Sequence, residues 1–424
     1  MSFKKVSVIG LGYIGLPTAA MFASKQLDVI GIDVNIDIVN KINAGEIHIV
    51  EPKLDEMIKG AVENGFLKAN TSPKPADAFV IAVPTPFLQD NSDDEIPKPD
   101  LNYIHSAAKS IANVLKKGDL VILESTSPVG TTEKMASWME EVRPDLSFPQ
   151  THGDDSDIRI AYCPERVIPG NIVSELVTND RIIGGMTKAC SKLAIDLYKI
   201  FVKGECIQTD ARTAEMSKLT ENASRDVNIA FANELSIICN SIDIDVWELI
   251  ALANRHPRVN ILQPGPGVGG HCIAVDPWFI VSSAPQYAKL ITKARQVNDE
   301  KPGWVVNEIK LAINNILKMD PKKSVSELKI ACYGLSFKPN IDDLRESPSL
   351  SIVNQVLDMN LAEVMLVEPN IKKLPENYDD RLLINFETAS STADIHVLLV
   401  DHDEFKGLCP SKGQIIDTRG CWSD

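Results

Sequence analysis

The sequence predicts an α/β protein in which two doubly wound domains with parallel sheets are joined by a long central helix. Short β-rich runs alternate with helical stretches near the N-terminus, and the same alternation returns from Leu328 onward. Between these regions, residues 209–240 contain neither glycine nor proline and place apolar residues at helical spacing. Alternation of strands and helices favours parallel sheets with helices on both faces. We expect domains at residues 1–205, 206–310 and 311–424.

The first domain begins with a strand, a glycine-rich turn, a helix and a second strand. Val6–Ile9 is the first strand, residues 16–25 form the helix, and Asp28–Asp33 is a strand that ends in an acid. Two further apolar strands are expected at Ala78–Val83 and Leu120–Leu123. The acidic stretch Asp90–Glu95, which two prolines follow, is expected to be an exposed loop.

The turn after the first strand has the spacing of a dinucleotide-binding fingerprint. Gly10 permits the tight turn, Gly12 lets the backbone approach a pyrophosphate, and Gly15 lets helix and strand pack closely. Asp33, 23 residues after Gly10, is placed to accept hydrogen bonds from ribose hydroxyls and to repel a 2′-phosphate. The pattern therefore favours NAD over NADP. The alternative is a glycine turn in a sheet that binds no dinucleotide.

The remaining elements follow the same logic. Residues 209–240 predict one or two long helices, a suitable place for a dimer contact. In the last domain we expect a helix over residues 349–359 and strands at Leu328–Gly334, Ala362–Val367, Ile395–Val400 and Gln414–Asp417. This half has no second Gly-x-Gly-x-x-Gly, so a Rossmann-like sheet there would bind something other than a dinucleotide.

Composition narrows the class of protein. The 424 residues include 43 Lys plus Arg and 58 Asp plus Glu, a net charge of −15, which argues against a nucleic-acid binder because phosphate neutralisation needs a basic face. An anionic small substrate needs only a local basic pocket. No apolar run reaches the ~18 residues of a membrane span, and the N-terminus lacks a signal-peptide pattern. We therefore expect a cytoplasmic protein without membrane partners, whose eight cysteines are reduced.

The stretch from Gly265 to Pro277 places four glycines in six residues shortly before Cys272. A cysteine beside a histidine and backbone N–H groups can have a lowered pKa and act as a nucleophile. Two alternatives stay open. One is a buried structural cysteine. The other is a metal site built from His271, Cys272, Asp276 and His256, although that spacing fits no standard zinc pattern.

Cationic side chains gather in several segments. Lys218, Asn222 and Arg225 fall at i, i+4 and i+7 of the predicted long helix and share one face, which either lines an anionic site or is simply solvated. Residues 254–258 form a dense cationic patch, and residues 337–347 follow the first strand of the last domain, where open α/β sheets bind ligands. Each segment alone would suit an ordinary surface loop.

Together these residues resemble the UDP-glucose/GDP-mannose dehydrogenase family over essentially the whole chain. The segments that carry the resemblance are the Gly10–Gly15 turn, Glu124-Ser125-Thr126, Cys163-Pro164-Glu165-Arg166, the Lys218/Asn222 helix, Gly269 through Cys272 to Asp276, Phe337-Lys338 and Arg345. Glucose-type members usually carry Ser and Lys where this chain has His271 and Val275, which makes it similar to the N-acetylhexosamine branch. Residues 254–260 are similar to the mannosamine members of that branch, a choice of epimer that rests on resemblance alone.

The resemblance implies two Rossmann-like domains, a homodimer, and two successive NAD-dependent oxidations at C6 of a nucleotide sugar. The implied substrate is UDP-N-acetyl-D-mannosamine, and the acid would serve bacterial surface polysaccharide synthesis. Cys272 would form a thiohemiacetal and then a thioester, so that no aldehyde escapes. The implied catalytic residues beside it are Lys218 and Asn222 for the oxyanion, Asp276 for proton transfer with Lys218, and Glu165 with Thr126 for the hydrolytic water.

By the same resemblance, the cofactor would contact Gly10, Gly12, Tyr13, Ile14, Gly15, Asp33, Thr85, Thr126 and Arg345. The substrate would contact Arg166, Val167, Lys218, Asn222, Arg225, His256, Arg258, Gly269, Phe337, Lys338, Arg345 and Arg419, and no metal is expected. Guanidinium groups suit a diphosphate, which would let this acidic protein bind an anionic ligand.

Three alternatives to this function remain. The same chemistry could act on UDP-N-acetylglucosamine or UDP-glucose. A two-electron dehydrogenase or an epimerase would leave Cys272 a structural role. A non-catalytic protein could bind nucleotide sugars on the same fold.

Overall fold

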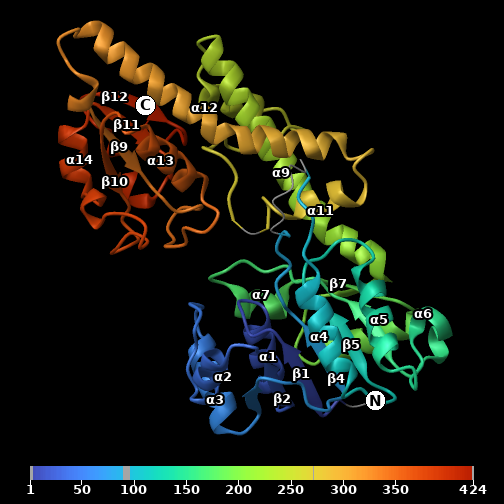
Figure 1. The fold of residues 1–424 in the computed structure, drawn as a ribbon. Coiled ribbons are helices and arrows are strands. Elements are labelled where there is room, and N and C mark those ends of the chain that lie inside the picture. The colour runs from blue at the N-terminus through green and yellow to red at the C-terminus, as the bar shows by residue number, and fades with distance from the viewer. Residues whose placement is uncertain (1–2, 89–95, 271, 423–424) are drawn as a thin grey trace. The chain divides into compact units, whose positions relative to one another are not determined.

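The computed structural model describes residues 3–88, 96–270 and 272–422 and divides into two compact units (Figure 1). Unit 1 comprises Met1–Glu221 and Trp278–Ala284, and unit 2 comprises Asn222–Pro277 and Pro285–Asp424. The predicted loop at Asp90–Glu95 lies outside the described residues. Each unit contains a sheet with helices on both faces, which confirms the predicted fold class of two Rossmann-like domains with a long central helix.

Unit 1 is built on an eight-stranded sheet in the order β3-β2-β1-β4-β5-β6-β7-β8. Its strands are β1 (Lys5–Ile9), β2 (Asp28–Ile32), β3 (Leu67–Asn70), β4 (Ala78–Ile81), β5 (Leu120–Leu123), β6 (Arg159–Tyr162), β7 (Arg181–Gly185) and β8 (Cys206–Asp210). All neighbours pair in parallel except β6 and β7. The strand order reverses between β1 and β4, and open α/β sheets bind ligands beyond the carboxyl ends of the strands at such a point.

Two layers of helices cover the sheet of unit 1. Helices α1 (Gly15–Ser24), α3 (Leu54–Glu63) and α8 (Lys188–Tyr198) pack on one face, and α4 (Asn102–Ala112) and α5 (Thr131–Val142) pack on the other. Strands β4 and β5 are buried along their whole length, as expected for parallel strands with helices on both sides. Shorter helices complete the unit at α2 (Ile36–Asn43), α6 (Pro149–His152) and α7 (Ile172–Thr178).

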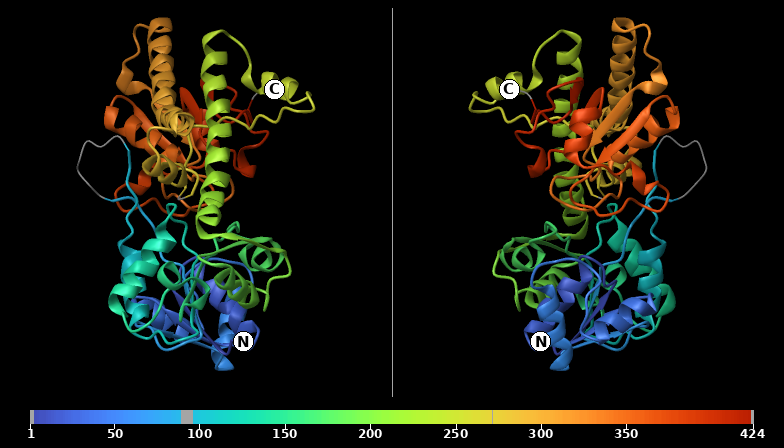
Figure 2. Two further views of the ribbon diagram at one scale, coloured as in Figure 1. Left: turned by 90° about the vertical axis from the view of Figure 1, so that its right-hand side faces the viewer. Right: turned by 90° about the vertical axis from the view of Figure 1, so that its left-hand side faces the viewer.

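The predicted long helix is a single helix of 31 residues, α9 (Ala211–Ser241), which Figure 2 shows as one uninterrupted coil. Its first turn is anchored in unit 1 by Glu215, whose buried carboxylate accepts the N–H groups of Gly130 at 2.6 Å and Thr132 at 2.8 Å. This carboxylate therefore caps the N-terminus of α5, where negative charge is favourable.

Unit 2 is built on a four-stranded parallel sheet in the order β10-β9-β11-β12. The strands are β9 (Lys329–Tyr333), β10 (Glu363–Val367), β11 (Ile395–Leu398) and β12 (Gln414–Asp417), close to the predicted positions. Helices α12 (Lys289–Met319) and α13 (Pro348–Met359) pack on one face and α14 (Phe386–Thr392) on the other (Figure 1). Ser347 caps α13 by accepting the N–H of Leu350, and Pro348 suits the first helical position.

Helix α12 contains Pro302 in its interior and continues past it. The helix is 31 residues long and runs through residue 310, the expected limit of the central segment. Because proline has no N–H, the carbonyl of Asn298 lacks its usual helical donor. The glycine-rich loop packs at this point, since a Cβ on Gly267 would stand 3.2 Å from Pro302 Cγ and 3.4 Å from Asn298 O.

A chain of buried polar contacts ties this loop to helices α9 and α12 within unit 2. Arg295 Nη1 pairs with Asp226 at 2.6 Å, and Asn298 Nδ2 donates to the same carboxylate oxygen at 2.8 Å. Asn233 donates to Asn298 Oδ1 at 2.9 Å and accepts the N–H of Gly265, also at 2.9 Å. Two smaller helices, α10 (Val246–Ala253) and α11 (Asp276–Ser283), flank the loop in sequence. The start of the glycine-rich loop is therefore fixed to the helices behind it.

Candidate active site

The glycine turn after β1 has the geometry that its sequence predicts. Gly10 has φ +89°, and a Cβ there would stand 2.5 Å from Ala82 O, so glycine is required. A Cβ on Gly15 would overlap the carbonyl oxygen of Gly10, which shows how closely α1 approaches the turn. A Cβ on Gly12 would meet nothing within 4 Å. The backbone at Gly12 is therefore open on that side, as the approach of a pyrophosphate requires.

Asp33 lies beside this turn at the carboxyl end of β2. Its side chain accepts the N–H of Leu11 at 3.0 Å and the N–H of Asn35 at 2.9 Å, and the residue is half-buried. A carboxylate has about four acceptor positions, so two remain for the hydroxyls of a ribose. Exposed Tyr13 and half-buried Ile14 complete the turn. The residues present thus fit the adenosine half of NAD.

Thr85 and Thr126 lie at the carboxyl edge of the same sheet, after β4 and β5. The Thr85 hydroxyl donates to the carbonyl oxygen of Thr126, and both residues are half-buried. Because β4 is the strand next to the switch point, both threonines stand on the side of the sheet where a ligand would bind. The structure thus brings these two predicted residues together.

Glu165 belongs to a buried cluster that sequence reasoning only partly found. Arg181, at the start of β7, pairs with Glu165 at 2.9 Å and with Glu124 at 3.4 Å. Glu124 also accepts the hydroxyl of Tyr198 at 3.0 Å and that of Thr18 at 3.3 Å. One guanidinium therefore serves two carboxylates. Arg181 and Tyr198 could not be found from the sequence because the partners that bury them come from distant strands.

The electrostatics of this cluster follow from its burial. Burial and the neighbouring Glu165 carboxylate raise the pKa of Glu124 from 4.5 to about 7, against the lowering effect of Arg181. Burial also raises the pKa of the Cys163 thiol to about 12, so Cys163 is no candidate nucleophile. Glu165 is fixed further by the N–H of Arg166, which donates to its other oxygen at 2.7 Å. A positioned carboxylate at this edge can orient a water molecule.

Arg166, another predicted residue, extends this cluster toward α9 within unit 1. The Arg166 guanidinium pairs with Glu221 at 2.9 Å, and Glu221 stands one helical turn beyond Lys218. Lys218 and Val167 are half-buried. Asn222, four residues after Lys218, shares its face of the continuous helix, as predicted.

In unit 2 the structure brings Asn222 and Asp276 together. The Asn222 amide donates to the Asp276 carboxylate at 2.5 Å, and Asp276, the first residue of α11, is 3% exposed. Cys272 is exposed, and its carbonyl oxygen accepts the N–H of Asp276 at 2.9 Å. An accessible thiol thus lies one turn before a buried, oriented carboxylate. Among the predicted alternatives, a buried structural cysteine is wrong for Cys272.

The predicted substrate residues after β9 contact the glycine-rich loop. A Cβ on Gly269 would stand 3.0 Å from Phe337 Cβ and would overlap the carbonyl oxygen of Glu346. The Phe337 ring lies against Gly270, where an added Cβ would be 3.1 Å from the ring. Arg345 is exposed and pairs with Asp343 at 2.6 Å. Gly269 and Phe337 therefore meet at the carboxyl edge of the second sheet, and Arg345 lies in the same segment of chain after β9.

The other predicted cations of unit 2 differ in their surroundings. Arg419, after β12, pairs with Asp401 at 2.6 Å, and its Nη1 would stand 2.5 Å from a Cβ on Gly265. Lys338 is exposed after β9. Arg225 is exposed on α9, and His256 and Arg258 are exposed on the loop after α10. Arg419 and Lys338 thus share the carboxyl edge of the sheet, whereas the last three lie on helical or loop surface.

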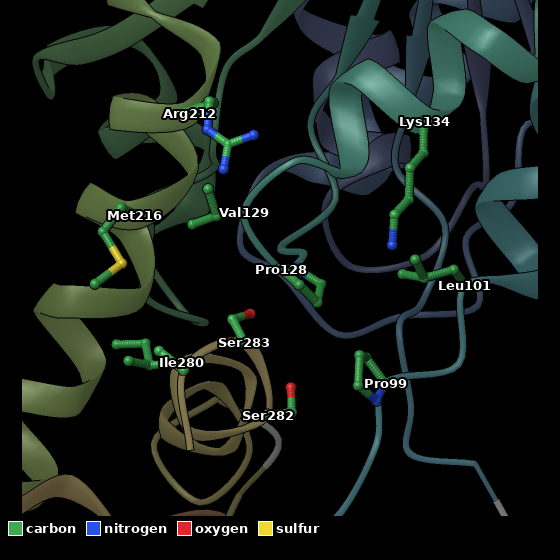
Figure 3. A pocket seen from close by; sticks show the side chains of 11 residues that line it. Pro99, Leu101, Pro128, Val129, Lys134, Arg212, Met216, Ile280, Ser282 and Ser283 are labelled. Atoms are coloured by element: carbon green, nitrogen blue, oxygen red, sulfur yellow. The ribbon is translucent and has the colours of Figure 1, made fainter. Parts of the chain in front are cut away.

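A separate cavity of about 490 Å³ lies in unit 1 (Figure 3). It is lined by Pro99, Leu101, Pro128, Val129, Met216, Ile280, Ala284, two serines, Lys134 and Arg212. Arg212 is already paired with Glu133 at 2.8 Å. None of the predicted cofactor or substrate residues lines this cavity, so it is distinct from the predicted site.

Within residues 3–88, 96–270 and 272–422, no group of three or more His, Cys, Asp or Glu side chains is arranged to hold a metal ion. His271, a member of the alternative metal site, lies outside the described residues. No described helix combines the length and apolarity needed to cross a bilayer.

Comparison with known proteins covers the whole chain. Three models of the UDP-glucose/GDP-mannose dehydrogenase family match: the NAD binding domain over residues 4–202, the central domain over 212–300 and the UDP binding domain over 331–424. The chain is 60% identical to UDP-N-acetyl-D-mannosamine dehydrogenase of Escherichia coli K12 over all of both proteins. It is also 60% identical to NDP-N-acetyl-D-galactosaminuronic acid dehydrogenase of Ralstonia nicotianae, over the whole chain and 97% of that protein. The solved structure of UDP-D-ManNAc dehydrogenase from Pyrococcus horikoshii aligns with a TM-score of 0.84 at 40% identity, covering 98% of this chain and 96% of that one.

Proposed function

The chain belongs to the UDP-glucose/GDP-mannose dehydrogenase family and is an NAD-dependent dehydrogenase, and on that premise we propose that it oxidises UDP-N-acetyl-D-mannosamine at C6 to the uronate. Two observations support this sugar: the 60% full-length identity to the enzyme named for that substrate, and the solved structures, where the UDP-D-ManNAc enzyme is 40% identical and the N-acetyl-D-galactosaminuronic acid enzyme 28%. The proposed setting is the cytoplasm, and the proposed use of the product is bacterial surface polysaccharide.

Cys272 is the proposed nucleophile of a four-electron reaction. NAD, when bound, accepts one hydride in each of the two oxidations. The alcohol first loses a hydride and a proton to become an aldehyde, and the thiol adds to that carbon to form a C–S bond. Loss of a second hydride and proton gives a thioester. Water then breaks the C–S bond, which releases the carboxylate and returns the thiol. The exposure of Cys272 supports this role.

The side chains near the reacting carbon have distinct proposed roles. Lys218 and Asn222 stabilise the oxyanion as the thiol adds, and the two share one face of α9. Asp276 takes part in proton transfer with Lys218 and is held by Asn222 at 2.5 Å. Glu165 orients the hydrolytic water, and Arg181 fixes its carboxylate. Thr126 is the proposed second contact of that water.

The binding residues divide between the two sheets. Gly10, Gly12, Tyr13, Ile14, Gly15, Asp33, Thr85, Thr126 and Arg345 are proposed for NAD. Arg166, Val167, Lys218, Asn222, Arg225, His256, Arg258, Gly269, Phe337, Lys338, Arg345 and Arg419 are proposed for the nucleotide sugar. The carboxyl edge of β9, β11 and β12 supports the second assignment for Phe337, Lys338 and Arg419 because open α/β sheets bind ligands there.

A homodimer and a three-part division at residues 205 and 310 are also proposed. Apolar side chains on α9 and after it are exposed by about half, among them Phe231 at 50%, Ile238 at 46% and Ile242 at 59%. Exposed apolar side chains gathered on one element are typical of an interaction surface. Light scattering of the purified chain would test the dimer.

A second candidate substrate is the corresponding N-acetyl-D-galactosamine nucleotide. The relative from Ralstonia nicotianae, named for the galactosaminuronic acid, is as similar in identity as the mannosamine enzyme. The two sugars differ in the orientation of hydroxyl and acetamido groups. A site that bonds one arrangement rejects another by leaving polar groups unpaired.

The decisive measurement is the number of NADH molecules formed per nucleotide sugar consumed. UDP-N-acetyl-D-mannosamine would be compared with the N-acetylgalactosamine, N-acetylglucosamine and glucose nucleotides. Two NADH on the mannosamine nucleotide alone would support the proposal. One NADH would contradict the thioester mechanism, and turnover on another sugar alone would contradict the substrate but keep the chemistry.

A further inference from the structure

The turn after β9 in unit 2 repeats the backbone geometry of the turn after β1 in unit 1. Gly334 has φ +88° and donates its N–H to Val367 O at 2.8 Å, just as Gly10, at φ +89°, donates to Ile32 O at 2.8 Å. A Cβ on Gly334 would overlap Val400, the second residue after β11, much as a Cβ on Gly10 would meet Ala82, the first residue after β4. The second sheet therefore keeps the first glycine of the dinucleotide turn without the other two.

The acid at the end of the second strand is also repeated, as Glu368 after β10. Glu368 accepts the N–H groups of Leu335 at 2.7 Å and Asn370 at 3.0 Å, the positions whose counterparts bond to Asp33 in unit 1. Asp33 is half-buried, but Glu368 is only 5% exposed. His402, which is fully buried, places Nε2 3.0 Å from its Oε2. Glu368 is thus bonded inside the protein and is closed to a ribose.

The hydrogen bonds of His402 fix which nitrogen carries the proton. Its Nδ1 accepts the backbone N–H of Asn340 at 2.9 Å, and an N–H can only donate. The proton therefore lies on Nε2, directed at Glu368. Burial on its own raises the pKa of Glu368, but the hydrogen bonds from His402, Leu335 and Asn370 bring that pKa below its usual value. The ionised carboxylate holds the ring in one tautomer and one orientation.

His402 and its neighbour Asp403 hold the segment Phe337–Asn340, which we call the substrate loop. The loop carries Phe337 and Lys338, two proposed contacts of the nucleotide sugar. At its start, the Ser336 hydroxyl donates to Lys338 O at 2.8 Å. At its end, Asn340 bonds to His402 through its backbone and exchanges two hydrogen bonds of 2.9 Å with Asp403. Asn340 also has φ +61°, a conformation that needs such external support.

We propose that His402 is a positioning residue for the nucleotide sugar, because it transmits the rigid placement of Glu368 to the substrate loop and so sets the affinity for the uridine diphosphate group. Glu368 corresponds to Asp33, the acid proposed to face the ribose of NAD, but here the carboxylate acts through His402 on the loop proposed to contact the nucleotide sugar. This inference rests on the proposed function, since it takes the substrate loop to contact a nucleotide sugar.

The test is the dissociation constant of UDP, measured by calorimetry on the full chain without sugar or NAD. His402→Met keeps the volume but loses both ring contacts, and we expect UDP to bind about 5- to 10-fold more weakly, the size of one or two lost hydrogen bonds. His402→Gln can donate to Glu368 and accept from Asn340, and should restore most of the affinity. NAD affinity should not change, and KM for the nucleotide sugar should rise more than kcat falls.

The matched control is His396→Met, since His396, on β11, is as buried as His402 but bonds to Tyr333. Equal losses of UDP affinity in the two methionine variants would overturn the inference, and so would unchanged affinity in a folded His402→Met. If that variant does not fold, the test uses Asn340→Ala, a substitution at an exposed position. UDP binding about threefold weaker than in the natural chain supports the inference, and unchanged UDP binding overturns it. A natural chain that binds no UDP would overturn both this inference and the proposed function, whereas equal UDP binding by the natural chain and its variants would overturn the inference alone.

Discussion

Lys301, on α12, gives a prediction whose size can be worked from its surroundings. The side chain is 2% exposed, its Nζ donates to Ser236 Oγ at 2.6 Å, and it lies 3.7 Å from the centroid of the Trp304 ring. Burial lowers the pKa of Lys301 from 10.5 to about 7, although Glu308 acts in the opposite direction. The unfolded chain therefore binds one more proton than the folded chain between about pH 7 and pH 10.5. The contribution of Lys301 to stability should therefore rise with pH across that window.

A full pH unit in this window is worth about 1.4 kcal/mol, and because Lys301 is still half-protonated in the folded chain at pH 7, it should add about 2.3 kcal/mol to the free energy of unfolding between pH 7 and pH 9. Lys301→Met has nearly the same shape and cannot be charged, so this gain should vanish. The assay is urea unfolding at several pH values, followed by tryptophan fluorescence, for the natural chain, Lys301→Met and the exposed control Lys310→Met. Parallel pH profiles for the natural chain and Lys301→Met would refute the reasoning.

The remaining predictions concern the active site and its supports. Cys272→Ser should slow the complete oxidation by at least about a hundredfold because a serine hydroxyl is a far poorer nucleophile at neutral pH; NADH release at the normal rate would contradict the covalent route. Gly12→Ala should weaken NAD binding, measured by calorimetry, and leave the melting temperature unchanged, because its Cβ meets no atom within 4 Å. Gly15→Ala should weaken NAD binding and also lower the melting temperature in thermal unfolding, because its Cβ would overlap the backbone of Gly10. Glu124 has its pKa raised from 4.5 to about 7, so the natural chain should lose stability as pH rises through that range. Glu124→Gln should not show this pH-dependent loss of stability, whereas the control Asp119→Asn, at the other end of β5, should. Comparing the free energy of unfolding at pH 5 and pH 7.5 would test this.

The elements that the sequence located well are those that local patterns determine. The apolar run Ala78–Val83 favours a buried strand and contains β4 (Ala78–Ile81), and the stretch without glycine or proline forms α9 as one helix. The Gly10–Gly15 turn was predictable because each glycine answers a local steric demand. Family membership and the use of NAD, both expected from these motifs, are confirmed by the comparisons.

The features that the sequence did not reveal depend on partners far along the chain. Helix α12 contains Pro302, which ordinarily marks a helix end, and only packing against the rest of unit 2 carries the helix past it. The antiparallel pairing of β6 with β7 is not indicated by any pattern within the sequence of either strand. Arg181 and His402 look like ordinary polar residues until the fold buries each against a carboxylate. Chemistry that is shared between strands cannot be found by spacing within one strand.

Pro302 also sets a direction for improving the heat resistance of this protein. Replacing it with alanine would relieve a helix penalty of about 3 kcal/mol, but it would remove the ring that stands against Gly267 and the loop leading to Cys272. We therefore expect variants selected for activity after heating to keep Pro302 and to carry substitutions at neighbouring positions of α12. Gly303 is the natural first choice, since a Cβ there meets nothing within 4 Å and alanine in a helix interior is worth about 1 kcal/mol over glycine.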